Sequence, residues 1–82
     1  MKLFVSPDRE VKRINVCRKV ESVEFLKLNR GILDVSVWID GKFLERKRTK
    51  EHDISIPVER YVNQLELRLS SSNDMYVDME VV

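Results

Sequence analysis

A hairpin signature near the middle of the chain is the feature that most constrains its fold. Residues 33–39 alternate between apolar side chains and Asp34, Ser36 and Trp38, the period-2 pattern of a strand with one buried face. The Asp40-Gly41 step that follows favours a type I′ turn, because both central residues of that turn need positive φ. The sequence therefore predicts a hairpin with these facing pairs: Ile39 with Lys42, Trp38 with Phe43, Val37 with Leu44, Ser36 with Glu45, Val35 with Arg46, and Asp34 with Lys47.

Further strands are predicted on both sides of this hairpin. Apolar or alternating segments occur at 2–5, 11–20, 23–28, 54–58, 65–69 and 75–81. Eighty-two residues leave room for one hydrophobic core, so we expect a single domain spanning residues 1–82. About seven short strands at regular spacing predict an all-β, antiparallel sandwich, with a small β-barrel as the alternative.

Several local features are open to test. The alternation changes parity between Phe25 and Leu26, which predicts either a β-bulge or a change of strand there. The segments 65–69 and 75–81 read as a hairpin joined by a turn at 70–74. Pro57 cannot donate to a ladder, so it is expected at a sheet edge or strand end.

Two short polar segments are less regular. Residues 46–50 are all polar and are expected to form a loop. Residues 7–11 leave two interpretations open, because Ser6 and Pro7 also resemble the start of a helical turn.

Three stretches carry a family resemblance: Val35–Lys42, Ile54–Pro57 and Asn63–Leu67. In residues 35–82 the chain resembles the small immunoglobulin-like domains appended to many bacterial proteins. It departs from their pattern in lacking a Gly before the Asn, a Gly in the last turn, and paired cysteines. The resemblance implies an immunoglobulin-like sandwich with an adhesive or spacer role, and it implies no catalytic residues.

Charge is unevenly distributed along the chain. The net charge is +1, but residues 1–50 contain 13 Lys and Arg against 7 Asp and Glu, while residues 51–82 contain 2 against 7. This asymmetry predicts either a basic binding face or two halves that neutralise each other in the fold. The candidate phosphate-contacting residues are Lys42, Arg46, Lys47, Arg48 and Lys50, with a second basic set at Arg9, Lys12, Arg13, Arg18 and Lys19.

Trp38 and Phe43 are the candidate partner-binding residues. The predicted register pairs these two rings on the mainly polar side of the hairpin. Aromatic residues are enriched at the centres of protein interfaces. The alternative is that a loop or the N-terminal segment covers both rings.

No motif for catalysis, metal binding or a cofactor is evident. His52 lies between two carboxylates but has no second His or Cys at ligand spacing. Cys17 is the one cysteine, so no disulfide within the chain is expected, and an inert thiol is the default. Neither a signal peptide nor a membrane span is evident, which favours a cytoplasmic setting.

The sequence thus predicts a non-catalytic module that binds a protein partner or a second copy of itself. It has no evident small-molecule substrate, cofactor or membrane association. A small nucleic-acid-binding β-barrel that uses the basic 42–50 loop is the alternative function.

Overall fold

The computed structural model describes all of residues 1–82 and contains six strands. They are β1 (Lys2–Val5), β2 (Glu10–Lys27), β3 (Leu33–Ile39), β4 (Lys42–Thr49), β5 (Ile54–Ser71) and β6 (Met75–Val81). All strand pairs are antiparallel, and the order in the sheet is β1-β6-β2-β5-β3-β4. The all-β, antiparallel prediction is therefore confirmed. No part of the chain forms a helix, so none is present that could cross a membrane.

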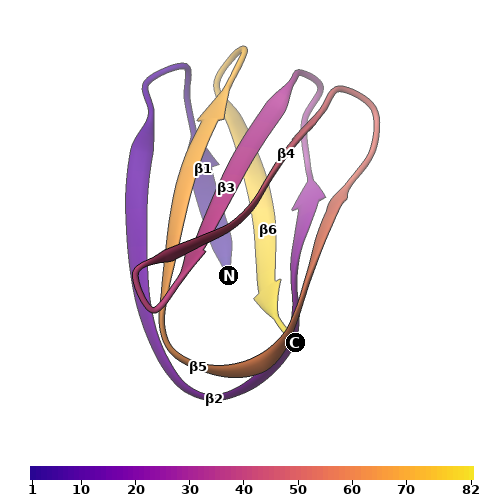
Figure 1. Ribbon diagram of the computed structural model, residues 1–82. Coiled ribbons are helices and arrows are strands. Elements are labelled where there is room, and N and C mark those ends of the chain that lie inside the picture. Colours follow the sequence, from indigo (N-terminus) through magenta and orange to yellow (C-terminus); the bar gives the residue numbers. More distant parts are fainter.

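The long strands β2 and β5 fold this single sheet over on itself. Each is 18 residues long, and they pair with each other from Glu10↔Leu69 to Phe25↔Ile54. Both bend sharply near their middles, so that their two halves lie in different layers (Figure 1). One layer holds β1, β6, the second half of β2 and the first half of β5. The other holds the first half of β2, the second half of β5, β3 and β4, and the sheet does not close into a barrel.

The bend coincides with irregular pairing between β2 and β5. The register shifts between Asn15 and Arg18 and again between Val20 and Ser22. Cys17 and Glu59 both have a φ of 54° in this region. An extra residue in one strand bends that strand and increases its twist. The two bulges therefore let one pair of strands serve both layers.

A single core of 19 buried residues fills the space between the layers. Phe25 and Met79 enter it from one layer, and Val37 and Leu67 enter it from the other. These side chains occupy the inward phase of each strand, as the period-2 pattern predicts. Because both layers share this core, they form one domain.

The central hairpin is confirmed in its turn and corrected in its register. Asp40 and Gly41 have φ values of 48° and 81°, as a type I′ turn requires, and the pairs Ile39↔Lys42 and Trp38↔Phe43 form as predicted. A register shift then adds Leu44 to β4 as an extra residue. The predicted pairs beyond it are wrong by one position; the observed ones are Val37↔Glu45, Ser36↔Arg46, Val35↔Lys47, Asp34↔Arg48 and Leu33↔Thr49.

The predicted hairpin between 65–69 and 75–81 does not form. Residues 65–69 of β5 are already flanked by β2 and β3, so this part of β5 has no free edge for β6. Residues 72–74 instead carry the chain across to the other layer, where β6 pairs with β1 and β2. The alternation of apolar and polar residues is the same whether two consecutive strands form a hairpin or lie in different layers.

Other expectations also change. The strand count is six rather than seven, because the segments at 11–20 and 23–28 form one strand, as do those at 54–58 and 65–69. Residues 46–49 extend β4 rather than forming a loop, and residues 7–11 contain no helical turn.

Leu26 and Leu28 mark a further correction. Neither a bulge nor a change of strand occurs between Phe25 and Leu26, since β2 continues to Lys27 and its pairing with β6 runs from Phe25↔Met79 to Leu26↔Asp78 without a shift. Both leucines simply point outward and are exposed. Pro57 lies where β5 has β2 as its only neighbour, so its predicted edge position is confirmed.

Candidate binding surface

The outer surface of the layer that contains β3 and β4 carries four of the chain's eight arginines. We call this surface the basic face. Cross-strand pairing places its outward residues in rows across four strands. They are Val11 and Arg13 from β2, Glu66, Arg68 and Ser70 from β5, Asp34, Ser36 and Trp38 from β3, and Phe43, Arg46 and Arg48 from β4.

Trp38 and Phe43 lie side by side at the turn end of the basic face. Their ring centroids are 5.1 Å apart at an interplanar angle of 68°, an edge-to-face arrangement. Trp38 is partly buried, whereas Phe43 is exposed, and no loop or N-terminal segment covers its ring. The predicted pairing of the two rings is therefore confirmed; that they bind a partner stays a prediction.

Arg68 covers the other side of Trp38. Its guanidinium carbon lies 4.1 Å from the centre of the Trp38 ring, the geometry of a cation–π contact. The same guanidinium donates to Glu66 Oε2 at 3.2 Å, and Arg13 donates to Glu66 Oε1 at 3.1 Å. Glu66 thus fixes two arginines from neighbouring strands beside the aromatic pair.

Asp34 on β3 likewise holds an arginine in place. Both of its carboxylate oxygens accept from Arg46, with distances of 3.0 Å to Nε and 2.5 Å to Nη2. This bidentate hydrogen bonding lowers the pKa of Asp34, and the positive charges of Arg9 and Arg48 add to the effect against the opposing effect of burial. The carboxyl group therefore stays ionised and holds the Arg46 guanidinium in a fixed orientation.

On the basic face the carboxylates lie deeper than the arginines that they bind. The side chains of its two acidic residues are only 12% exposed for Asp34 and 16% for Glu66. Their arginine partners lie further out and keep much larger exposed fractions. A partner approaching this face would meet guanidinium groups and the Phe43 ring before it met a carboxylate.

The structure separates the five basic residues of the 42–50 stretch. Arg46 and Arg48 are on the basic face. Lys42 and Lys47 are opposite Ile39 and Val35, in the inward phase of the edge strand, and Lys47 Nζ donates across to the Ser55 carbonyl at 2.6 Å. Lys50 is in the loop after β4. The stretch is therefore not one basic loop.

Arg13, Arg68, Asp34 and Glu66 complete the surface, and the sequence analysis did not assign them to it. Arg13 appeared only within a second basic set, and Arg68 lay in a stretch with net negative charge. The period-2 pattern could have identified them, since each occupies an outward position of its strand. The sequence does not show which strands are neighbours, so it could not bring these residues together on one surface.

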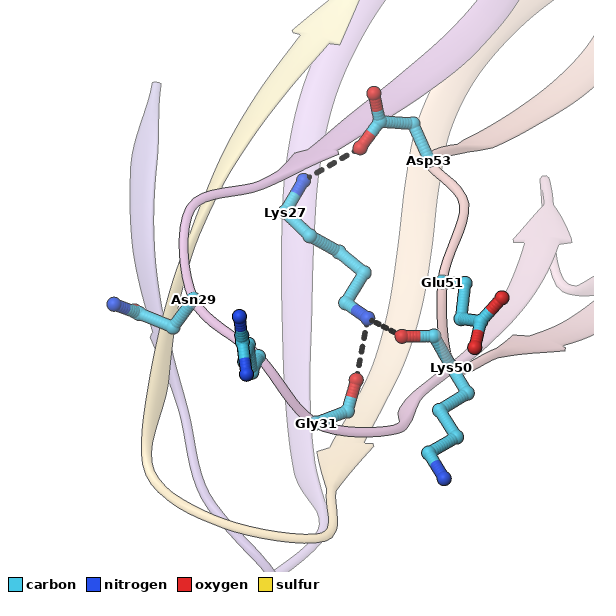
Figure 2. A pocket seen from close by; sticks show the side chains of 7 residues that line it. Lys27, Asn29, Gly31, Lys50, Glu51 and Asp53 are labelled. Atoms are coloured by element: carbon cyan, nitrogen blue, oxygen red, sulfur yellow. Dashed lines mark hydrogen bonds between the residues drawn. The ribbon is translucent and has the colours of Figure 1, made fainter.

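The largest cavity lies elsewhere, at the end where the loops before β3 and β5 meet (Figure 2). It measures about 430 Å³ and is lined by polar groups only. The Lys27 ammonium points between the two loops and donates to the Gly31 and Lys50 carbonyls, while the Lys27 backbone N–H donates to Asp53 at 2.9 Å. These hydrogen bonds hold the two loops together, so the cavity lies where the loops are joined.

The remaining candidate groups are scattered. His52 is exposed in the loop after β4, where its backbone N–H donates to the Thr49 hydroxyl at 3.0 Å. Cys17 is exposed at the bend of β2 as a free thiol. Neither residue lies on the basic face.

Comparison with known proteins adds no assignment. No protein-family model matches the chain, and no curated protein matches it in sequence.

Proposed function

We propose that this chain is a non-catalytic binding module that docks onto an acidic surface of a protein partner through its basic face. The observation that carries the proposal is the layering of charge around Trp38 and Phe43. An exposed ring lies among arginines whose carboxylate partners lie beneath them. Aromatic and arginine side chains are the types that dominate binding energy at protein interfaces.

Fixed geometry supports the same proposal. Arg46, Arg68 and Arg13 are each held by a carboxylate of the chain. A side chain that is already ordered loses less conformational entropy when it binds. Guanidinium groups also keep free donors for a second, bidentate contact with a carboxylate. The resemblance to immunoglobulin-like spacer domains fits this role and stays a prediction.

The proposal can be tested with a fluorescently labelled acidic peptide that contains one tyrosine. Fluorescence anisotropy should show salt-sensitive binding to the wild-type chain, lost when Trp38→Ser and Phe43→Ser are combined. Tyr61→Ser is the matched control, because Tyr61 at the bend has the same 58% exposure as Phe43. Equal binding by all three proteins, or none at low salt, would refute the proposal.

Single-stranded nucleic acid is the second candidate partner. An exposed aromatic ring beside two arginines, Arg46 and Arg48, two positions apart on β4, suits a base and its flanking phosphates. A labelled oligothymidine in the same assay distinguishes the two candidates. Tighter binding of the oligonucleotide than of the peptide, with the same loss in the double variant, would replace the protein partner by a nucleic acid.

A further inference from the structure

The opposite outer surface of the sandwich differs sharply from the basic face. We call it the acidic face; it is formed by outward residues of β1, β6 and the second half of β2. Three of its members are carboxylates and one is a lysine, and the N-terminal ammonium of Met1 pairs with one of the carboxylates, Asp78, at 3.2 Å. The residues are Lys2, Phe4, Glu24, Leu26, Leu28, Tyr76, Asp78 and Glu80.

Four apolar side chains at one end of the acidic face have no cover. Phe4 and Tyr76 pack edge to face with centroids 5.5 Å apart. Leu28 lies next to Tyr76, since its backbone N–H donates to the Tyr76 carbonyl, and Leu26 is two residues before it on the same strand. All four are 45–48% exposed. An exposed apolar strip rimmed by charge is the usual mark of an interaction surface.

The carboxylates at the other end lack cations from this chain. Glu24 and Glu80 are directly opposite each other on β2 and β6. Like charges in facing positions of a sheet are destabilising. The Glu24 carboxylate accepts from the Ser55 hydroxyl at 2.6 Å, and no basic side chain of the chain pairs with either glutamate. A cation supplied from outside would relieve this repulsion.

We infer that the acidic face of one copy docks onto the basic face of a second copy, so that molecules stack head to tail. The inference rests on the proposed function and names the partner: the acidic surface that the basic face binds is the other side of the same chain. Arginines would then meet Glu24 and Glu80, and the Trp38–Phe43 pair would cover the apolar strip. The complementary charges give the contact its direction.

Size and symmetry set what this contact can do. The Cα trace extends over 33 × 20 × 20 Å. Face-to-face stacking therefore buries on the order of 600 Å² per partner, below the roughly 800 Å² of a standard interface. We expect weak, salt-sensitive association. Because the two surfaces differ, the interface is heterologous and each added copy exposes a fresh docking surface.

Two charge-reversed variants test the inference. Arg48→Glu reverses a charge on the basic face, and it is combined with Arg9→Glu because the charge of Arg9 acts on Asp34 of that face. Neither arginine side chain makes a hydrogen bond within the chain. Glu24→Lys with Glu80→Lys reverses the acidic face. In sedimentation velocity at low salt, the wild type should associate as its concentration rises. Each variant alone should stay monomeric, because both of its faces then carry the same charge. Their equimolar mixture should associate again, because every contact between the two variants joins oppositely charged faces.

Matched controls change charge equally away from both faces. Lys19→Glu with Lys50→Glu, and Glu21→Lys with Glu51→Lys, should both associate like the wild type. Wild-type protein that stays monomeric at every concentration, or a variant mixture that does not associate, would overturn the stacking. The proposed function is tested separately, because the acidic-face variant keeps the basic face and should still bind the acidic peptide. Absence of peptide binding by the wild type would instead refute the proposed function.

Discussion

The two outer faces of the sandwich share a construction and differ in charge. On each, an aromatic pair is arranged edge to face and one of its rings carries a cation. Arg68 lies over Trp38 on the basic face, and Lys2 lies over Tyr76 on the acidic face. The aromatic pairs alone would make the two faces look equivalent, so charge is what distinguishes them.

The difference depends on where the carboxylates lie. Asp34 and Glu66 on the basic face are nearly covered and bond to arginines. Glu24 and Glu80 on the acidic face are opposite each other with no arginine or lysine between them. The net charge of +1 conceals this arrangement. A near-neutral chain can thus present two oppositely charged surfaces when its sheet folds over.

The largest effect is expected from the core that joins the two faces. Leu67 is fully buried between the layers, and Leu67→Ala should lower the free energy of unfolding by about 2–5 kcal/mol. Circular dichroism and Trp38 fluorescence should report one coincident transition, because both layers share one core. Two separate transitions would mean that the faces belong to independent units.

A smaller effect is expected from the carboxylate that holds the basic face. Asp34→Asn should cost about 1–2 kcal/mol in urea unfolding, because a charge-assisted, bidentate hydrogen bond to Arg46 is weakened. Asp78→Asn on the acidic face is the matched control, since Asp78 pairs with the N-terminal amine at a half-exposed position. Equal losses would remove the distinction between covered and exposed carboxylates.

The effect of Asp34 should also depend on pH. Its pKa is lowered in the folded chain by Arg46, so its stabilising contribution is complete above the ordinary aspartate value of about 3.9. The contribution is lost as pH falls through the lowered pKa. The difference in unfolding free energy between wild type and Asp34→Asn should therefore shrink in acid. A difference that grows as the pH drops would contradict the lowered pKa.

The smallest effect is a gain on the acidic face. Glu80→Lys replaces a like-charged cross-strand pair by an opposite one and should raise stability by roughly 0.2–1 kcal/mol. High salt should reduce this gain, because both side chains are near solvent. A loss of stability at low salt would show that Glu24 and Glu80 do not repel each other in the free chain.

Sequence reasoning identified the strands better than their partners. Alternation and the Asp40-Gly41 turn specify local geometry, so the hairpin and the inward residues followed. The bend did not, since the positive φ of Cys17 and Glu59 is imposed by pairing between distant segments. The place of β6 was missed for the same reason: it depends on which strand edges remain free.

The candidate site also contains residues that could be predicted from local sequence and residues that could not. Trp38 and Phe43 are neighbours across a tight turn, so their register could be predicted. Arg13 and Arg68 are at least 25 residues away from either ring in the sequence (38 − 13 and 68 − 43), and only the sheet order brings them together. The basic 42–50 stretch misled because a bulge at Leu44 and an edge strand distribute its side chains to different sides.

The most direct test of the central claim is an amide chemical-shift titration of the labelled chain with the acidic peptide. The account predicts that the shifts concentrate on the basic face, at Arg13, Ser36, Phe43, Arg68 and the Trp38 indole N–H. Residues of the acidic face, such as Phe4 and Tyr76, should move little at concentrations where the chain is monomeric. Shifts confined to the acidic face, or spread evenly over the molecule, would contradict the assignment of the basic face as the binding surface.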